Sequence, residues 1–134
     1  MTSVLVVDPN PDNRRAVQQA LTASNQFERV LACPNFDAAE RELASAPIEV
    51  MLVADSLARS HAVIEDLKSR MPALGVVVVR EPGDLLDAAG LKALGMDAQT
   101  SRSASPMELI ASVAKALVAS ITHSPRHLKK LLKD

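Results

Sequence analysis

Charged residues stand at the ends of three short, valine-rich apolar runs in this sequence. The runs are Val4–Val7, Val50–Val53 and Val76–Val79, and Asp8, Asp55 and Arg80 follow them directly or one residue later. Uninterrupted apolar runs are typical of strands buried on both faces, as in a parallel sheet. The carboxyl ends of such strands meet at one edge of the sheet. We therefore expect two carboxylates and a guanidinium in one crevice, where the acids could hold a hard cation or pair with the arginine.

The elements that would position these residues alternate between strand and helix. Weaker strands are predicted at Phe27–Cys33 and Asp97–Ser101. Five helices are predicted, at Pro11–Ser24, Phe36–Ala46, Ser60–Met71, Asp84–Leu94 and from Ser105 to Ile121. Asn10 and Asn35 can cap the first two, and Gly95 can end the fourth. The fifth begins with the capping box Ser105–Glu108. Five alternations predict an α/β fold, a three-layer, doubly wound (βα)5 parallel sheet with the flavodoxin-like strand order 2-1-3-4-5.

Composition bounds the function classes. The chain has 134 residues, enough for one domain, and its 15 basic and 16 acidic residues leave a net charge of −1. That balance, and the absence of Trp and Tyr, argue against nucleic-acid binding. The start of the sequence lacks a signal-peptide pattern and Cys33 is the only cysteine, so we expect a cytoplasmic protein with a buried, inert thiol. No glycine-rich phosphate loop follows Asp8.

Three features together resemble a known family. The segment Val4–Asp12 reads VLVVDPNPD, the block Gly95–Leu109 contains GMD and SPMEL, and Arg80 precedes Arg102 by 22 positions. In these features the chain resembles the receiver domain of bacterial two-component response regulators, of the chemotaxis-regulator type. The resemblance covers nearly the whole chain and implies a signalling module of a phosphorelay, not an enzyme.

The resemblance also implies that the phosphorylation chemistry is largely lost. Of the family's paired acids, Asp8 is kept and Pro9 replaces the second. The phosphoacceptor position falls on Ala54, the Thr/Ser position on Arg80, and the Lys position on Arg102, which Ser103 follows where the family has proline. The expected protein is thus a degenerate pseudo-receiver without bound magnesium. We expect Arg80 to pair with Asp8 and with Asp55, and a trans peptide bond before Ser103.

Some assignments stay open. Asp55 is a candidate phosphoacceptor, although a shift of one residue along a strand turns a side chain to the opposite face. Arg102 could replace the family's lysine inside the crevice or lie on the surface. The histidines lack the spacing of a metal site, since Pro125 separates His123 from His127.

The predicted partner face comprises the fourth helix, the fifth strand and the fifth helix. Its candidate contacts are Lys92, Met96, Gln99 and Met107, and its partner is another protein or a second copy. We divide the chain into a receiver-like domain, 1–122, and a basic amphipathic extension or linker, 123–134. That tail is the only candidate for membrane contact. Two other functions remain: a response regulator phosphorylated on Asp55, and a localisation or assembly domain of a larger machine such as a pilus-assembly ATPase.

Overall fold

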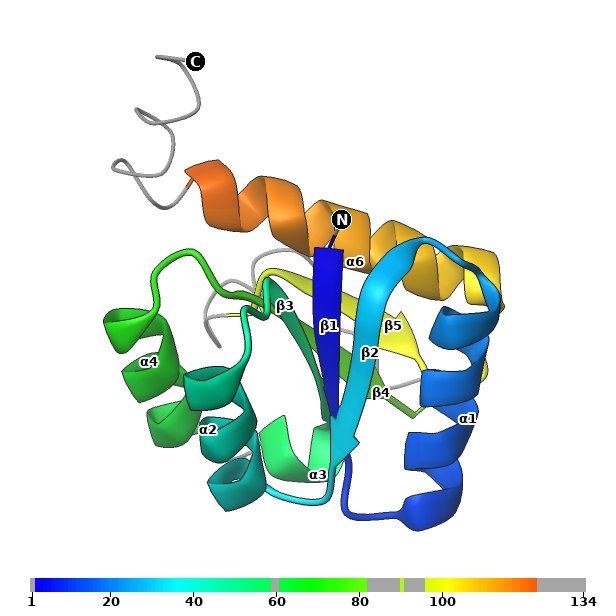
Figure 1. Ribbon diagram of the computed structural model, residues 1–134, viewed down its shortest axis with the longest axis horizontal. Coiled ribbons are helices and arrows are strands. Elements are labelled where there is room, and N and C mark those ends of the chain that lie inside the picture. Colours follow the sequence, from blue (N-terminus) through cyan, green and yellow to red (C-terminus); the bar gives the residue numbers. More distant parts are fainter. Residues whose placement is uncertain (1, 59–60, 82–89, 91–95, 123–134) are drawn as a thin grey trace.

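The computed structural model describes residues 2–58, 61–81, 90 and 96–122, and contains the predicted parallel sheet (Figure 1). The strands are β1 (Thr2–Val7), β2 (Phe27–Cys33), β3 (Val50–Ala54), β4 (Gly75–Arg80) and β5 (Ala98–Ser101). Their spatial order is β2-β1-β3-β4-β5, and all neighbours pair in parallel. The predicted fold class and strand order are therefore confirmed.

Four of the described helices match predicted ones and one was missed. They are α1 (Pro11–Ala23), α2 (Phe36–Ser45), the missed α3 (Asp55–Ala58), α4 (His61–Arg70) and α6 (Pro106–Thr122), which is the fifth predicted helix. The predicted helix at 84–94 lies outside the described residues except for Gly90, and the tail 123–134 lies wholly outside them. Within the described part of the chain, no helix is long and apolar enough to cross a membrane.

Side-chain caps fix where three of these helices begin. The Asn10 side chain accepts hydrogen bonds from the backbone N–H groups of Asp12 and Asn13, at 3.0 and 3.1 Å, and Pro11 occupies the first helical position. Asn35 accepts from Ala38 N in the same way, and Ser105 Oγ accepts from Glu108 N. Such caps satisfy N–H groups that have no partner within the helix.

The sheet separates two apolar cores. Alternate residues of each strand face opposite layers: Leu5 and Met51 pack beneath α2, α3 and α4, whereas Val4 and Leu52 pack beneath α1 and α6. Figure 1 shows α2 and α4 on one side of the sheet and α1 on the other. Burial on both faces explains why the strands read as continuous apolar runs.

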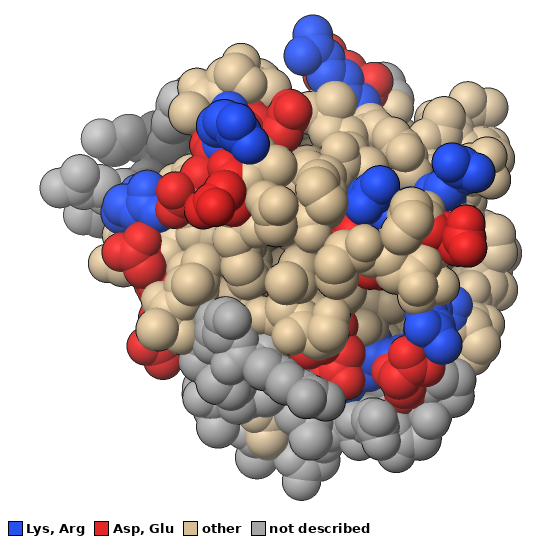
Figure 2. Space-filling model, turned by 90° about the horizontal axis from the view of Figure 1, so that it is seen from below, with Lys and Arg blue, Asp and Glu red and all other residues tan. Residues whose placement is uncertain are grey.

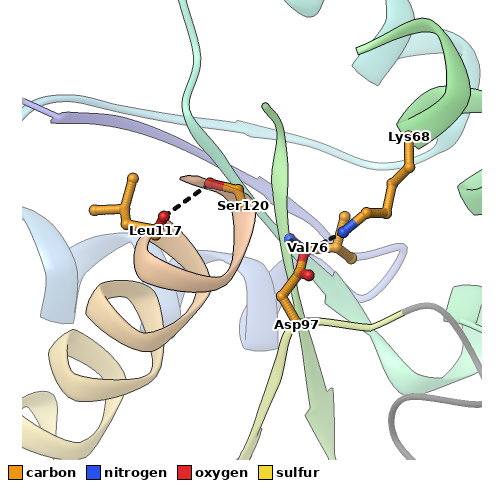
Figure 3. Close-up of polar contacts among 5 residues, drawn as sticks. All are labelled: Lys68, Val76, Asp97, Leu117 and Ser120. Atoms are coloured by element: carbon orange, nitrogen blue, oxygen red, sulfur yellow. Dashed lines mark hydrogen bonds and ion pairs between the residues drawn. The ribbon is translucent and has the colours of Figure 1, made fainter. Parts of the chain in front are cut away.

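Asp97 connects three elements at the end of the sheet where the strands begin. Its carboxylate accepts a hydrogen bond from Val76 N at 2.8 Å and forms an ion pair with Lys68 of α4, and Figure 3 shows these groups converging on it. The Asp97 side chain is only 3% exposed. Nearby, Ser120 Oγ of α6 donates to the Leu117 carbonyl (Figure 3). Because the carboxylate is desolvated, its charge depends on Lys68 and the Val76 amide.

Candidate functional site

A cavity opens at the carboxyl ends of the strands, where sequence analysis places the crevice. Its volume is about 280 Å³, and it is lined by Asp8, Pro9, Asn10, Asn13, Ala54, Asp55, Ser56, Val79, Glu81 and Arg102. Figure 2 looks onto this end of the molecule, where acidic and basic side chains are interspersed around an uncharged centre. Ser56 and Asn13 were missed as lining residues, because the only signal is that they lie in the first turns of the helices that follow β3 and β1.

Asp8 is held by its own loop and not by Arg80. Its side chain accepts a hydrogen bond from Asn10 N at 2.9 Å, which makes an Asx turn, and its carbonyl accepts from Arg14 Nη1 at 2.9 Å. The predicted Arg80–Asp8 pair is therefore wrong. The turn that leads into α1 already uses the Asp8 carboxylate locally.

Arg80 instead pairs with Asp55, the other predicted partner. Arg80 Nη1 lies 3.0 Å from Asp55 Oδ1, and their side chains are 9% and 22% exposed. The Nε atom of Arg80 is buried and has no hydrogen-bond partner. The guanidinium is thus a desolvated permanent cation whose compensating negative charge is the Asp55 carboxylate.

The structure places Asp55 at the crevice, as expected, and shows why the alternation of side chains along a strand does not turn it away. Strand β3 ends at Ala54 and α3 begins at Asp55, so the alternation of side chains along a strand does not extend to Asp55. Ala54 and Asp55 both line the cavity. The carboxylate therefore lies at the crevice although it stands one residue after the family's position.

Arg102 occupies the rim of the cavity and not its floor. It lines the cavity, but its side chain is 45% exposed and its Nη2 lies 2.8 Å from Glu81 Oε2. The peptide bond before Ser103 is trans, as predicted. Ser103 N donates to Ser101 Oγ at 3.2 Å, and Ala104 N donates to the Ser101 carbonyl. Strand β5 thus leads into α6 through a turn built on serine side chains.

Cys33 lies behind the crevice, at the end of β2. Its carbonyl accepts a hydrogen bond from Asp8 N at 3.1 Å, and its thiol donates to the Asn35 carbonyl. Burial, followed by the negative charge of Glu42, raises the pKa of the Cys33 thiol despite the opposing effect of the Asn35 hydrogen bond. The predicted buried thiol is confirmed.

The predicted partner face is exposed at only some of its candidate residues. Lys92 lies outside the described residues, and Gln99 is partly buried. Met96 is 5% exposed and belongs to the core beneath α4, so its assignment as a surface contact is wrong: an apolar side chain before β5 packs inward. Met107, on α6, is 80% exposed.

Comparison with known proteins places this geometry in a fold family. No family model and no curated protein sequence matches the chain. Among solved structures it is similar to NtrX from Brucella abortus, with a TM-score of 0.80 and 22% identity, across 99% of this chain and 30% of that one. It is also similar to a receiver domain protein from Clostridium thermocellum, with a TM-score of 0.73 and 17% identity, across 98% and 99% of the two chains. The fold is that of response-regulator receiver domains.

A third neighbour comes from a different functional setting. It is a pilus assembly-related protein from Burkholderia pseudomallei, with a TM-score of 0.71 and 13% identity, across 89% of this chain and 91% of that one. The receiver fold found here thus also occurs in a protein of that description. At this identity the likeness concerns the fold alone.

Proposed function

We propose that this chain is a pseudo-receiver, a protein-interaction module of response-regulator type that signals without being phosphorylated and catalyses no reaction. The observation that carries the proposal is the ion pair between Arg80 and Asp55. It places a permanent cation against the only carboxylate that stands near the family's phosphoacceptor position. That carboxylate is neutralised by a fixed partner, so its role is structural.

The donor atoms of the crevice support a function without magnesium. Magnesium takes six oxygen ligands in near-octahedral geometry, with carboxylates among them. Pro9 and Ala54 carry no side-chain oxygen, the Asp8 carboxylate accepts from Asn10 N, and Asp55 pairs with Arg80. In the described parts of the chain, no three acidic, histidine or cysteine side chains converge on one point. These residues do not fit the family's metal site.

Phosphorylation on Asp55 is the second candidate function. It is favoured by the position of Asp55, whose side chain lines the cavity and is 22% exposed. A phosphodonor could therefore approach the oxygen that does not face Arg80. The two candidates differ in whether that carboxylate becomes an acyl phosphate.

Intact mass after incubation with a small phosphodonor and magnesium separates them. A pseudo-receiver keeps its mass, whereas phosphorylation adds about 80 Da in an acid-labile form. A gain that disappears in Asp55→Asn would overturn the proposal in favour of the second candidate. A gain that survives in Asp55→Asn would place the modification elsewhere and would equally contradict it.

An assembly role is compatible with the same site, because a module without phosphorylation chemistry can act by docking alone. The likeness to the pilus assembly-related protein supports this variant of the proposal. Immobilised protein that retains the same partner from untreated and phosphodonor-treated lysate would support it. Retention only after treatment would contradict phosphorylation-independent docking.

A further inference from the structure

Helix α6 carries an apolar stripe on the face that points away from the sheet. The stripe consists of Met107, Ala111, Ala114 and Val118, all exposed, and we call it the outer stripe. Met107 and Val118 are 80% and 63% exposed, and they are the large exposed apolar side chains of the described residues. A surface helix usually presents charged and polar residues on this face. The outer stripe is therefore typical of a contact surface.

The spacing of the stripe makes it complementary to itself. Its members stand at positions i, i+4, i+7 and i+11, within about 60° of one another around the helix, because each residue turns the helix by about 100°. The two large side chains lie at the ends and the two alanines at the centre. When a second copy is laid antiparallel, Met107 of each copy meets Val118 of the other and the alanines meet at the middle. Small residues at the crossing point let two helices approach closely.

The charges of α6 select this antiparallel arrangement. Glu108 and Lys115 are the only charged residues from Pro106 to Thr122. They are seven residues apart, so they lie on one flank of the outer stripe at a separation of about 10 Å along the axis. Reversing the second helix sets Glu108 of each copy beside Lys115 of the other, whereas a parallel twofold arrangement places the two charged flanks on opposite sides of the contact, where they form no pairs. Lys115 has no ion-pair partner among the described residues, and Glu108 contacts only Ser105 through one oxygen.

We propose that the outer stripe of α6 is the interface of a homodimer, in which two copies of this chain pack their α6 helices antiparallel about a twofold axis. The proposal rests on the proposed function in one respect, since it names a second copy as the partner of the interaction module. Such an isologous contact uses the same patch on both subunits. A contact made chiefly by one helix from each subunit is small, so the dimer should form reversibly with concentration.

Sedimentation equilibrium of the full chain over a concentration series tests the interface. The expected result is a monomer–dimer equilibrium whose dissociation constant rises about tenfold in Glu108→Lys, because two attractive pairs become repulsive. The double variant Glu108→Lys/Lys115→Glu restores the pairs with exchanged signs and should return the constant toward wild type. Circular dichroism shows whether α6 stays folded. A monomer at every concentration, or a double variant no better than the single one, would overturn the proposal.

Disulfide trapping tests the orientation independently. Met107→Cys and Val118→Cys are prepared separately, and Cys33 is too buried to interfere. Under mild oxidation, mixing the two variants should give the crosslinked dimer, and each variant alone should give little, because like positions lie about 16 Å apart along the axis. Crosslinking of each variant alone would contradict the antiparallel arrangement. The proposed function would be contradicted by a different result, a gain of mass after treatment with a phosphodonor. Failure of the dimer interface and failure of the proposed function are therefore distinguishable.

Discussion

Arg80 Nη1 lies 3.0 Å from Asp55 Oδ1 at the crevice of the sheet. The Arg80 side chain is the more buried of the two, with 9% exposed against 22% for Asp55. The pair joins the end of β4 to the first residue of α3. A fixed salt bridge thus lies at the position where the resemblance to receiver domains places the metal ion and the phosphoryl group.

Removing either partner of this pair should destabilise the protein, but unequally. Asp55→Ala leaves the buried guanidinium without a counterion and should lower the free energy of unfolding by about 3 kcal/mol. Arg80→Met leaves a carboxylate that water can still reach and should cost about 1 kcal/mol or somewhat more. Urea denaturation of both variants measures the two losses.

The exposed pair at the same crevice provides the matched control. Arg102 and Glu81 are 45% and 47% exposed, so Arg102→Met should change the free energy of unfolding by no more than about 1 kcal/mol. If Asp55→Ala cost no more than Arg102→Met, the Arg80–Asp55 pair would not be the desolvated link described here.

Asp97 should be more important to stability than its position between loop and strand indicates. Asp97→Ala leaves Lys68 without its ion-pair partner and Val76 N without a hydrogen-bond acceptor at the edge of the core. We therefore expect the free energy of unfolding to fall by about 3 kcal/mol. Lys68→Met should cost at least as much, because it leaves the Asp97 carboxylate, which is only 3% exposed, without its counterion. Thermal and urea unfolding of both variants give the comparison, and a negligible loss in Lys68→Met would show that the ion pair does not compensate the buried charge.

Gly75 should not tolerate a side chain. A Cβ atom there would lie 2.9 Å from the carbonyl oxygen of Ala116, a backbone atom of α6 that no rotamer change can move. Gly75→Ala should therefore destabilise the protein by about 1–3 kcal/mol. Where a glycine has room, the same change stabilises a protein by roughly 0.4–1 kcal/mol. A neutral or stabilising result in chemical denaturation would mean that α6 lies farther from β4.

Cys33 should respond to alkaline pH. Because the pKa of its thiol is raised above the ordinary value of 9.0, the native state binds the proton more tightly than the unfolded state. The stabilisation is complete below the ordinary value and is lost as pH rises through the native value. The stability advantage of wild type over Cys33→Ala should therefore be constant below the ordinary value of 9.0 and shrink as the pH rises above it. An advantage that is constant with pH would contradict the burial of this thiol.

The rate of alkylation of Cys33 is a second test of the burial of its thiol. The native thiol should react slowly with iodoacetamide at pH 8 and the urea-unfolded thiol quickly, since only the exposed thiolate is an effective nucleophile. Equal rates in the two states would show that the thiol is accessible.

The strands and most helices could be predicted because their signals are local. A run such as Val76–Val79 has no stable place other than a doubly buried strand, and the caps at Asn10 and Asn35 fix where helices begin. The four residues of α3 were missed, because a single turn carries neither a periodic apolar pattern nor a capping residue.

The pairing of charges was harder to predict than the fold. The sequence places Asp8, Asp55 and Arg80 in one crevice, but it does not show that the Asp8 carboxylate would accept from Asn10 N, two residues along the chain, in preference to Arg80. Asp97 and Lys68 are separated by 29 positions and belong to elements whose packing decides the contact. Met96 was misassigned because a single methionine beside a strand does not reveal which face it joins.

The most direct test of the central claim is intact mass spectrometry of the wild-type chain, incubated with a small phosphodonor and magnesium. A variant with the family's residues restored, Pro9→Asp/Ala54→Asp/Arg80→Thr/Arg102→Lys, serves as the positive control and should gain about 80 Da. The account predicts that the wild-type mass does not change under the same conditions. An acid-labile gain of about 80 Da in the wild type, abolished by Asp55→Asn, would contradict it.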